Sequence, residues 1–222
     1  MPDLEANRRG YIIGDSTGHS GATDARAASS GTPKDSHTDA VNDAIQYFES
    51  SGRGGGTYRY TRTFLHFDTS GITNIIPTSD VKLTVDGSTN ADGNIVAIKH
   101  DAGSGEGDEI IGDDFNNIFF PTGGSETIKY SESTSWSTGT NQIVLNSLAI
   151  SDINNFDNFN IALVLFVDQV NDDDPIGADG DISCGVDFSS NIFLTYSLPT
   201  FFTPLKKIKS GLLKISSGKV KL

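Results

Sequence analysis

One stretch of the sequence decides the fold class: Tyr58-Arg59-Tyr60-Thr61-Arg62-Thr63-Phe64-Leu65-His66-Phe67. Its side chains alternate in character for ten residues, which is typical of a β-strand with two different faces. The glycine-rich segment 51–56 comes directly before it, and residues 40–48 come before that segment. The apolar spacing in 40–48 also fits a helix, but we favour a strand, because a flexible loop between two strands makes a hairpin.

Further strands are predicted at short intervals. Residues 81–85 alternate, with Asp86-Gly87 as the turn after them, and residues 161–167 are continuously apolar, as in a central strand covered on both faces. One short helical turn is expected near residues 151–155, capped by Ser151 or Asp152. The other candidate strands are residues 11–13, 94–99, 110–120, 126–130, 142–148, 182–188 and 192–196. This series predicts an all-β protein, a jelly-roll-like antiparallel β-sandwich with a short β-type C-terminal tail.

The charge of the chain is divided between two regions. The 222 residues carry 16 basic and 29 acidic side chains, a net charge of −13. Residues 199–222 hold six lysines and no acidic residue, so residues 1–198, with the other ten basic and all 29 acidic side chains, have a charge of −19. An acidic body repels nucleic acid and anionic membrane surfaces. We therefore predict two parts, a sandwich domain over 1–198 and a tail over 199–222, and no nucleic-acid partner.

The tail contains a seven-residue repeat. Leu205-Lys206-Lys207-Ile208-Lys209-Ser210-Gly211 is followed at once by Leu212-Leu213-Lys214-Ile215-Ser216-Ser217-Gly218 and by an incomplete third copy. A glycine in every repeat disfavours a coiled coil, and short strands broken by Ser-Gly turns fit better. Such strands have unpaired edges and little core, so we expect a partner to order them. The residues assigned to assembly are Lys206, Lys207, Lys209, Lys214, Lys219 and Lys221.

Two motifs resemble the DNRLRE family of jelly-roll domains. The first is Arg62-Thr63-Phe64-Leu65-His66-Phe67-Asp68-Thr69-Ser70-Gly71-Ile72, and the second is Pro77-Thr78-Ser79-Asp80-Val81-Lys82-Leu83-Thr84-Val85, with Asp80 where the family usually has Ala. Residues 160–167 and 188–196 resemble its last two strands, without the usual Pro. The resemblance covers residues 8–198 and implies a scaffold related in shape to carbohydrate-binding modules, found in bacterial surface and phage structural proteins. The motif residues are mainly structural, and Asp68 and Ser70 are expected to cap a turn.

No catalytic residue is predicted. The single cysteine, Cys184, cannot form an internal disulfide, and its strand-like, acidic context predicts a small buried side chain with a raised pKa. The four histidines (His19, His37, His66 and His100) lack the spacing of zinc ligands. Carboxylates are numerous, but no local motif singles out an acid–base pair. We therefore expect a protein that is not an enzyme.

Two acidic loops are candidates for a structural calcium ion, the one cofactor considered. The assigned ligands are Asp172, Asp174, Asp179 and Asp181, and residues 101–114 form a second acidic loop. Calcium takes six to eight oxygen ligands from flexible, carboxylate-rich loops, although neither loop has the EF-hand spacing. Solvated acidic turns are the favoured interpretation.

Three aromatic residues are candidates for ligand binding: Trp136, Tyr58 and Tyr60. A flat ring can stack on the face of a sugar, and Trp136 lies in a polar loop between predicted strands. The alternative role for a single loop tryptophan in a sandwich is to fill one end of the core.

These observations favour a non-enzymatic structural or assembly protein of a virion or surface appendage, such as a phage-type capsid, fibre or filament subunit. Its expected partners are further copies of itself or other appendage proteins. The alternative is a carbohydrate-binding module or a host-receptor-binding adhesin that contacts a cell-surface glycan. The first residues lack the apolar segment of a cleaved signal peptide, and no run is long enough to span a membrane. We therefore expect synthesis in the cytoplasm and a place in a virion or extracellular appendage.

Overall fold

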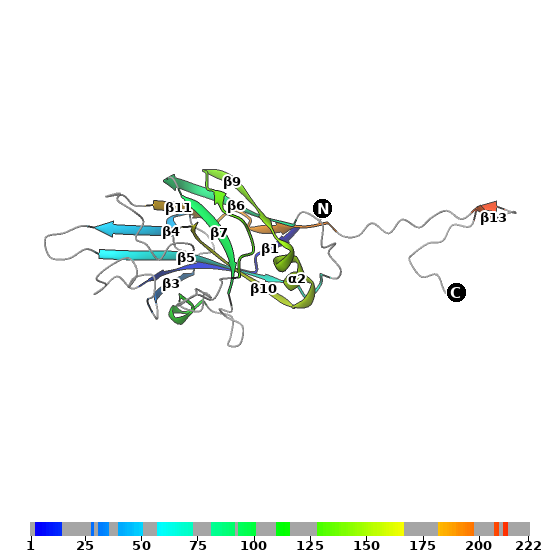
Figure 1. Ribbon diagram of the computed structural model, residues 1–222, viewed down its shortest axis with the longest axis horizontal. Helices are drawn as coiled ribbons and strands as arrows, with labels where there is room; N and C mark the ends of the chain where they lie inside the picture. Colours follow the sequence, from blue (N-terminus) through cyan, green and yellow to red (C-terminus); the bar gives the residue numbers. More distant parts are fainter. Residues whose placement is uncertain are drawn as a thin grey trace.

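The computed structural model describes residues 3–14, 28, 31–35, 40–50, 57–72, 81–91, 93–100, 110–115, 128–166, 182–197, 207–208 and 211–212 (Figure 1). Within these ranges the strands pair antiparallel throughout, and one α-helix is present. The protein is therefore all-β, as the sequence predicts.

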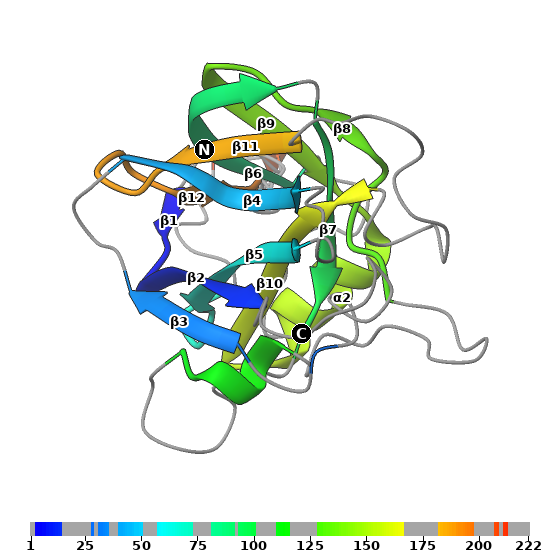
Figure 2. The same ribbon diagram turned by 90° about the vertical axis from the view of Figure 1, so that its left-hand side faces the viewer.

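Two layers of strands face each other in the body (Figure 2). The first layer is built around β6 (Val81–Ala91), which has β9 on one side and β12 followed by β11 on the other. The layer extends outward from β12 to β1 and from β11 to β4. The bounds of the strands around β6 are β9 Gly139–Leu145, β11 Ile182–Asp187, β12 Phe193–Thr195, β1 Asp3–Glu5 and β4 Ala40–Ser50.

The second layer is built around β5 (Thr57–Asp68), which contains the alternating stretch of residues 58–67. One edge of β5 pairs with β2, and the other pairs first with β4 and then with β10. The layer continues from β2 to β3 and from β10 through β7 to β8. Their bounds are β2 Arg8–Gly14, β3 Gly31–Asp35, β10 Asn158–Leu165, β7 Asn94–Lys99 and β8 Thr134–Ser135.

The predicted hairpin of β4 and β5 joins the two layers. Residues 46–50 of β4 pair with residues 57–61 of β5, and Ser50 lies opposite Thr57. Toward its other end β4 pairs with β11 of the first layer, and β5 pairs with β10 of the second. Together they close one side of the sandwich, and the strand interpretation of residues 40–48 is confirmed.

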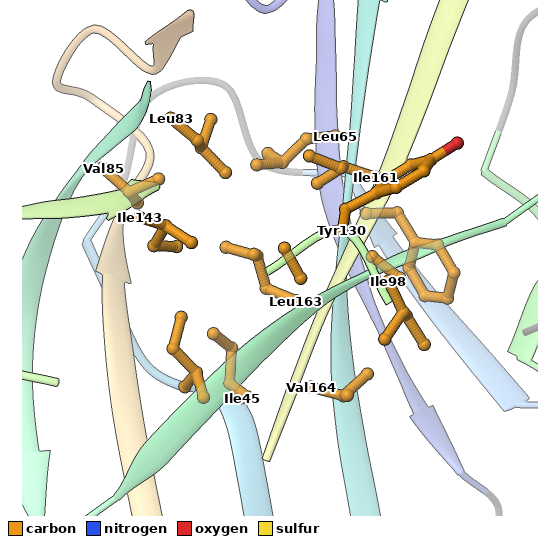
Figure 3. Packing of buried hydrophobic residues seen from close by; sticks show 14 of the residues in the cluster. Ile45, Leu65, Leu83, Val85, Ile98, Tyr130, Ile143, Ile161, Leu163 and Val164 are labelled. Atoms are coloured by element: carbon orange, nitrogen blue, oxygen red, sulfur yellow. The ribbon is translucent and has the colours of Figure 1, made fainter. Parts of the chain in front are cut away.

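The core lies between the facing sides of the two layers (Figure 3). Residues opposite each other in an antiparallel pair project to the same face, so Leu65 of β5 and Ile161 of β10 point the same way. Figure 3 shows them with Leu163, and with Leu83 and Ile143 from the first layer. All five side chains are fully buried. Each contributes about 1.5–3 kcal/mol through removal from water, so this contact between the layers stabilises the sandwich.

The predicted turn at Asp86-Gly87 is wrong, because β6 continues through it to Ala91. Asp86 pairs with Thr140 and Gly87 with Gly139 of β9. A β-carbon on Gly87 would lie 2.2 Å from the carbonyl oxygen of Ser137. A glycine is thus required here because two backbone segments approach closely. Glycine also serves turns, so the sequence alone does not distinguish the two roles.

The helix is longer than predicted and is capped elsewhere. It is α2 (Ser147–Asn155), and the side-chain oxygen of Asn146 accepts hydrogen bonds from the amides of Leu148 and Ala149. The cap is therefore Asn146, not Ser151 or Asp152, because its carboxamide oxygen satisfies two of the first free amides.

The strand predicted over 142–148 accordingly ends at residue 145. The strand predicted over 110–120 is also wrong where it is described, because Gly112–Phe115 is a short 3-10 helix, and residues 116–120 lie outside the described ranges. At 126–130, the described residues make only an isolated bridge between Ile98 and Lys129.

The other strand predictions are confirmed, with shifts of a few residues at their ends. β1, β3 and β8 were not predicted. β3 contains Pro33, which lowers the strand propensity of its sequence, and β1 and β8 are only 3 and 2 residues long. Among the described residues, no helix has the length and apolar character needed to cross a bilayer.

Candidate functional site

Trp136, the first candidate for ligand binding, is 3% exposed. It follows β8, and its indole N–H donates a hydrogen bond to the carbonyl oxygen of Gly185 in β11, 3.1 Å away. Its indole nitrogen would lie 2.9 Å from a β-carbon on Gly87, which places the ring against the centre of the first layer. The structure thus gives Trp136 the alternative role of filling the core, and its ring presents no face for stacking on a sugar.

The two tyrosine candidates lie on β5 and differ in exposure. Tyr60 is 2% exposed and packs on Tyr47, with 5.1 Å between the ring centroids. Tyr58 is half-buried and packs against the core. Tyr60 therefore does not fit the ligand-binding assignment, and Tyr58 is the candidate whose ring is partly accessible.

The four predicted calcium ligands, Asp172, Asp174, Asp179 and Asp181, lie outside the described residues, as do residues 101–109 of the second acidic loop. In the ranges that are described, no three histidine, cysteine or acidic side chains gather in a way that could hold a metal ion. The calcium site stays a prediction from the sequence.

The tail contributes two strands, β13 (Lys207–Ile208) and β14 (Gly211–Leu212). Lys207 pairs with Leu212 and Ile208 with Gly211, so the two strands run antiparallel to each other, with Gly211 inside a strand. They form a sheet of their own, separate from the strands of the body. This pairing agrees with the predicted β-type tail. The other assembly residues, Lys206, Lys209, Lys214, Lys219 and Lys221, lie outside the described residues.

Cys184 is a buried residue of β11. Burial raises the pKa of its thiol to about 12, so the nucleophilic thiolate is not populated near neutral pH. A β-carbon on Gly93 would lie 2.1 Å from the Sγ atom, which shows how closely the backbone packs on the sulfur. The predictions of a small apolar side chain and of a raised pKa are confirmed, but the cause of the raised pKa is burial and not the acidic context.

Two aspartates cap turns in the same way. The side chain of Asp68 accepts hydrogen bonds from the hydroxyl and the amide of Ser70, at 2.6 and 3.0 Å. Asp187 accepts from the amide of Ser189 and the hydroxyls of Ser189 and Ser190. These hydrogen bonds hold the pKa of both carboxyl groups below the ordinary value, and the bonds from the serine hydroxyls have the largest effect. The expected capping role is confirmed for Asp68, whereas the hydroxyl of Ser70 donates to the Asp68 carboxylate.

The structure brings together two histidines that are far apart in the sequence. His66 of β5 and His100, directly after β7, lie with 5.2 Å between their ring centroids, and Phe64 meets the ring of His100 edge-on at 5.1 Å. Burial, and then the charge of His66, lowers the pKa of His100, while backbone hydrogen bonds with Ile161 and Leu65 act in the opposite direction. His100 is therefore neutral in the folded protein at neutral pH. His19 and His37 lie outside the described residues.

A buried arginine shares this face of β5. Arg62 is 0% exposed, and its Nη1 donates to the carbonyl oxygen of Phe115 at 2.7 Å. Its guanidinium carbon also lies 4.0 Å from the centroid of the Phe115 ring. A β-carbon on Gly14 would come within 2.5 Å of the same ring, so β2 packs closely there. The 3-10 helix is thereby fastened over the outer face of the second layer.

These buried groups were missed because a period of two cannot distinguish a solvent-facing polar residue from one covered by a distant loop. Arg62 and His66 alternate with Thr63 and Leu65, as the polar residues of a half-exposed strand do. The one signal in the sequence is Phe64, a large apolar residue between them on the same face.

Comparisons with known proteins give no assignment. The chain matches no protein-family model, and no curated protein is similar to it in sequence at a significant level.

Proposed function

We propose that the chain is a non-enzymatic structural subunit that self-associates through its sandwich and its tail. The observation that carries this proposal is the tail's own small sheet. Among the described strands, β13 and β14 pair only with each other, and Figure 1 places β13 apart from the strands of the body. A sheet of two residues on each strand buries too little surface to be stable alone. Its order therefore requires another surface.

The charges of the two regions indicate what that surface is. The tail carries +6 and residues 1–198 carry −19, so a body of another copy attracts the tail. The tail also combines apolar and lysine side chains, which suits β-type contact with an acidic neighbouring subunit. Main-chain hydrogen bonds then supply affinity, and the lysines select an acidic partner.

The reactive groups of the body support the non-enzymatic part of the proposal. Cys184 is buried as a neutral thiol, His100 is enclosed among aromatic rings, and Asp68 accepts hydrogen bonds within a turn. Each of these side chains contributes to the fold. A hydrolysis assay on polysaccharides tests this part directly, and turnover by the purified chain would overturn it.

The likeness to the DNRLRE pattern suggests the setting of such a subunit. Domains with that pattern occur in phage structural proteins and bacterial surface proteins, so we place the chain in a virion or extracellular appendage, as a phage-type fibre, filament or capsid subunit. Both motifs fall partly on described strands, β5 and β6, where their residues build the core.

Sedimentation velocity of the intact chain and of a chain ending at residue 198 tests self-association through the tail. We expect the intact chain to form oligomers that weaken as salt is raised, because salt screens the attraction between tail and body. The shortened chain is expected to sediment as a smaller oligomer than the intact chain, or as a monomer. A matched variant with the six tail lysines changed to arginine keeps the charge and should associate.

A different outcome would favour the carbohydrate-binding alternative. If the intact chain is a monomer, is unaffected by removal of the tail and binds glycans on an array, the proposal fails. Tyr58 would then be the first residue to change, because its ring is the accessible one of the three aromatic candidates.

A further inference from the structure

Four strands lie at the outer edges of the body's layers: β1, β3, β8 and β9. In the described part of the chain, each of them pairs with one neighbour only. An unpaired edge can add a strand from another chain, and natural proteins block this with short strands, prolines and charges. The four edges can therefore be compared for such protection.

Three of the edges are protected. β1 and β8 are 3 and 2 residues long, and β1 carries the acidic side chains of Asp3 and Glu5. β3 contains Pro33, which has no amide hydrogen to donate, followed by Lys34. None of these three strands offers a long, uncharged row of backbone groups.

β9 has none of these protections. Its seven residues, Gly-Thr-Asn-Gln-Ile-Val-Leu, include no proline and no charged side chain. The exposed positions alternate along the strand, and Val144 is 54% exposed. Figure 1 shows β9 at the upper margin of the body. An edge of this length with an exposed apolar side chain is what a partner strand requires.

The sequence around β9 identifies the partner as a second copy of the same edge. Residues 133–151 hold no charged side chain, although charged residues make up 20% of the chain and its net charge is −13. Two copies of this acidic protein repel each other over most of their surfaces. A charge-free edge is the place where identical strands meet without like charges opposite each other.

We propose that the protein self-associates by antiparallel pairing of β9 with β9 of a second copy, a two-fold contact that continues the first layer from one subunit into the next. The inference rests on the proposed function and names the surface through which the sandwich takes part. The tail is then left free to contact further subunits.

The register follows from full overlap of the strand with itself. Pairing all seven residues places Gly139 opposite Leu145 of the second copy, Thr140 opposite Val144, and Gln142 opposite Gln142 at the two-fold axis. This arrangement covers the exposed Val144 with a threonine methyl group. It also places residues of the same face opposite each other, because the numbers of the two opposed residues differ by an even number and side chains alternate between faces with a period of two. Gln142 is exposed, and within its subunit its Oε1 accepts from Nζ of Lys82 at 3.5 Å.

The test uses the intact chain with Gln142→Lys, with Gln142→Glu, and with both variants mixed in equal amounts. Like charges directly opposite each other at the axis are expected to weaken β9 pairing, measured by sedimentation equilibrium, roughly tenfold for Gln142→Lys. The loss is expected to be smaller for Gln142→Glu, because Lys82 partly compensates the new charge. The mixture should associate at least as well as the native chain, because opposite charges then meet.

Two comparisons make the result decisive. Asn155→Lys and Asn155→Glu place the same charges on the exposed end of α2 and should leave association unchanged, and thermal unfolding verifies that every variant is folded. Native association that persists in both Gln142 variants, or a mixture that associates no better than each variant alone, overturns the β9 contact while the proposed function stands. A native chain that is monomeric at all concentrations overturns both.

Discussion

The body and the tail of this protein differ in how their strands are stabilised. In the described part of the body, twelve strands form one connected hydrogen-bonded network, and even polar residues such as Arg62 are enclosed with partners. In the tail, the described strands are two residues long and pair only with each other. In the proposed function the body folds by itself, whereas the order of the tail depends on a neighbour. Changes in the body should therefore alter stability, and changes in the tail should alter association.

The largest effect on stability is expected at the buried arginine. Arg62→Ala removes the hydrogen bond to the Phe115 carbonyl and the contact with its ring, and leaves a cavity under the 3-10 helix. We expect a loss of about 3 kcal/mol in the free energy of unfolding, measured by urea titration. Arg59→Ala on the same strand is the control, because Arg59 is half-buried and should cost about 1 kcal/mol. Equal losses would contradict the role given to Arg62.

The next effect is expected at Gly87. In Gly87→Ala the new methyl group meets the carbonyl oxygen of Ser137 and the indole of Trp136, so β6 and the loop before β9 must separate. We expect a loss of about 2 kcal/mol, from overpacking, in the same titration. Gly71→Ala is the matched control, because no atom lies within 4 Å of its added β-carbon. A harmless Gly87→Ala would show that the close approach is not needed.

A pH-dependent effect is expected from His100. Its pKa in the folded protein is lowered from the ordinary value of 6.5, so below about pH 6.5 the unfolded chain binds more protons than the folded one. The contribution of His100 to the free energy of unfolding should therefore be fully present above pH 6.5. It should decrease on acidification, with a slope of up to about 1.4 kcal/mol per pH unit. Between pH 7 and 5, His100→Phe should show a shallower fall in chemical denaturation, and identical slopes would exclude this assignment.

The smallest effect on stability is expected from the tail. A chain ending at residue 198 keeps every strand of the body, so its free energy of unfolding should change by no more than about 0.5 kcal/mol under conditions where both chains are monomeric. A loss of several kcal/mol would mean that the tail packs on its own body, which would remove the contrast between the two regions.

The sequence predicts the fold correctly where a single pattern of apolar residues, either alternating or continuous, identifies a strand. β5 and β10 are identified by alternation and by a continuous apolar run, and the hairpin of β4 and β5 by the glycines between them. It is misleading where a residue type serves two purposes. Gly87 has the signature of a turn but permits a close backbone contact, and the apolar residues of 110–120 contribute Phe115 from a 3-10 helix.

The groups that matter in the candidate sites were less predictable. His66 and His100 are adjacent only because β5, β10 and β7 pair in that order, and no local pattern specifies the order. The sequence left two roles possible for Trp136, ligand binding and filling the core, and its hydrogen bond to Gly185 in the structure distinguishes them. The edge position of β9 is likewise visible only after its pairing with β6, its one partner among the described strands, has been identified. Local chemistry can be inferred from sequence, but these sites depend on long-range pairing.

Electron microscopy of the purified intact chain, negatively stained at a moderate protein concentration and low salt, tests the central claim most directly. Self-association through the sandwich and the tail predicts regular oligomers or filaments of repeating subunits. A field of separate particles, each the size of one chain, would contradict the proposal that this protein assembles.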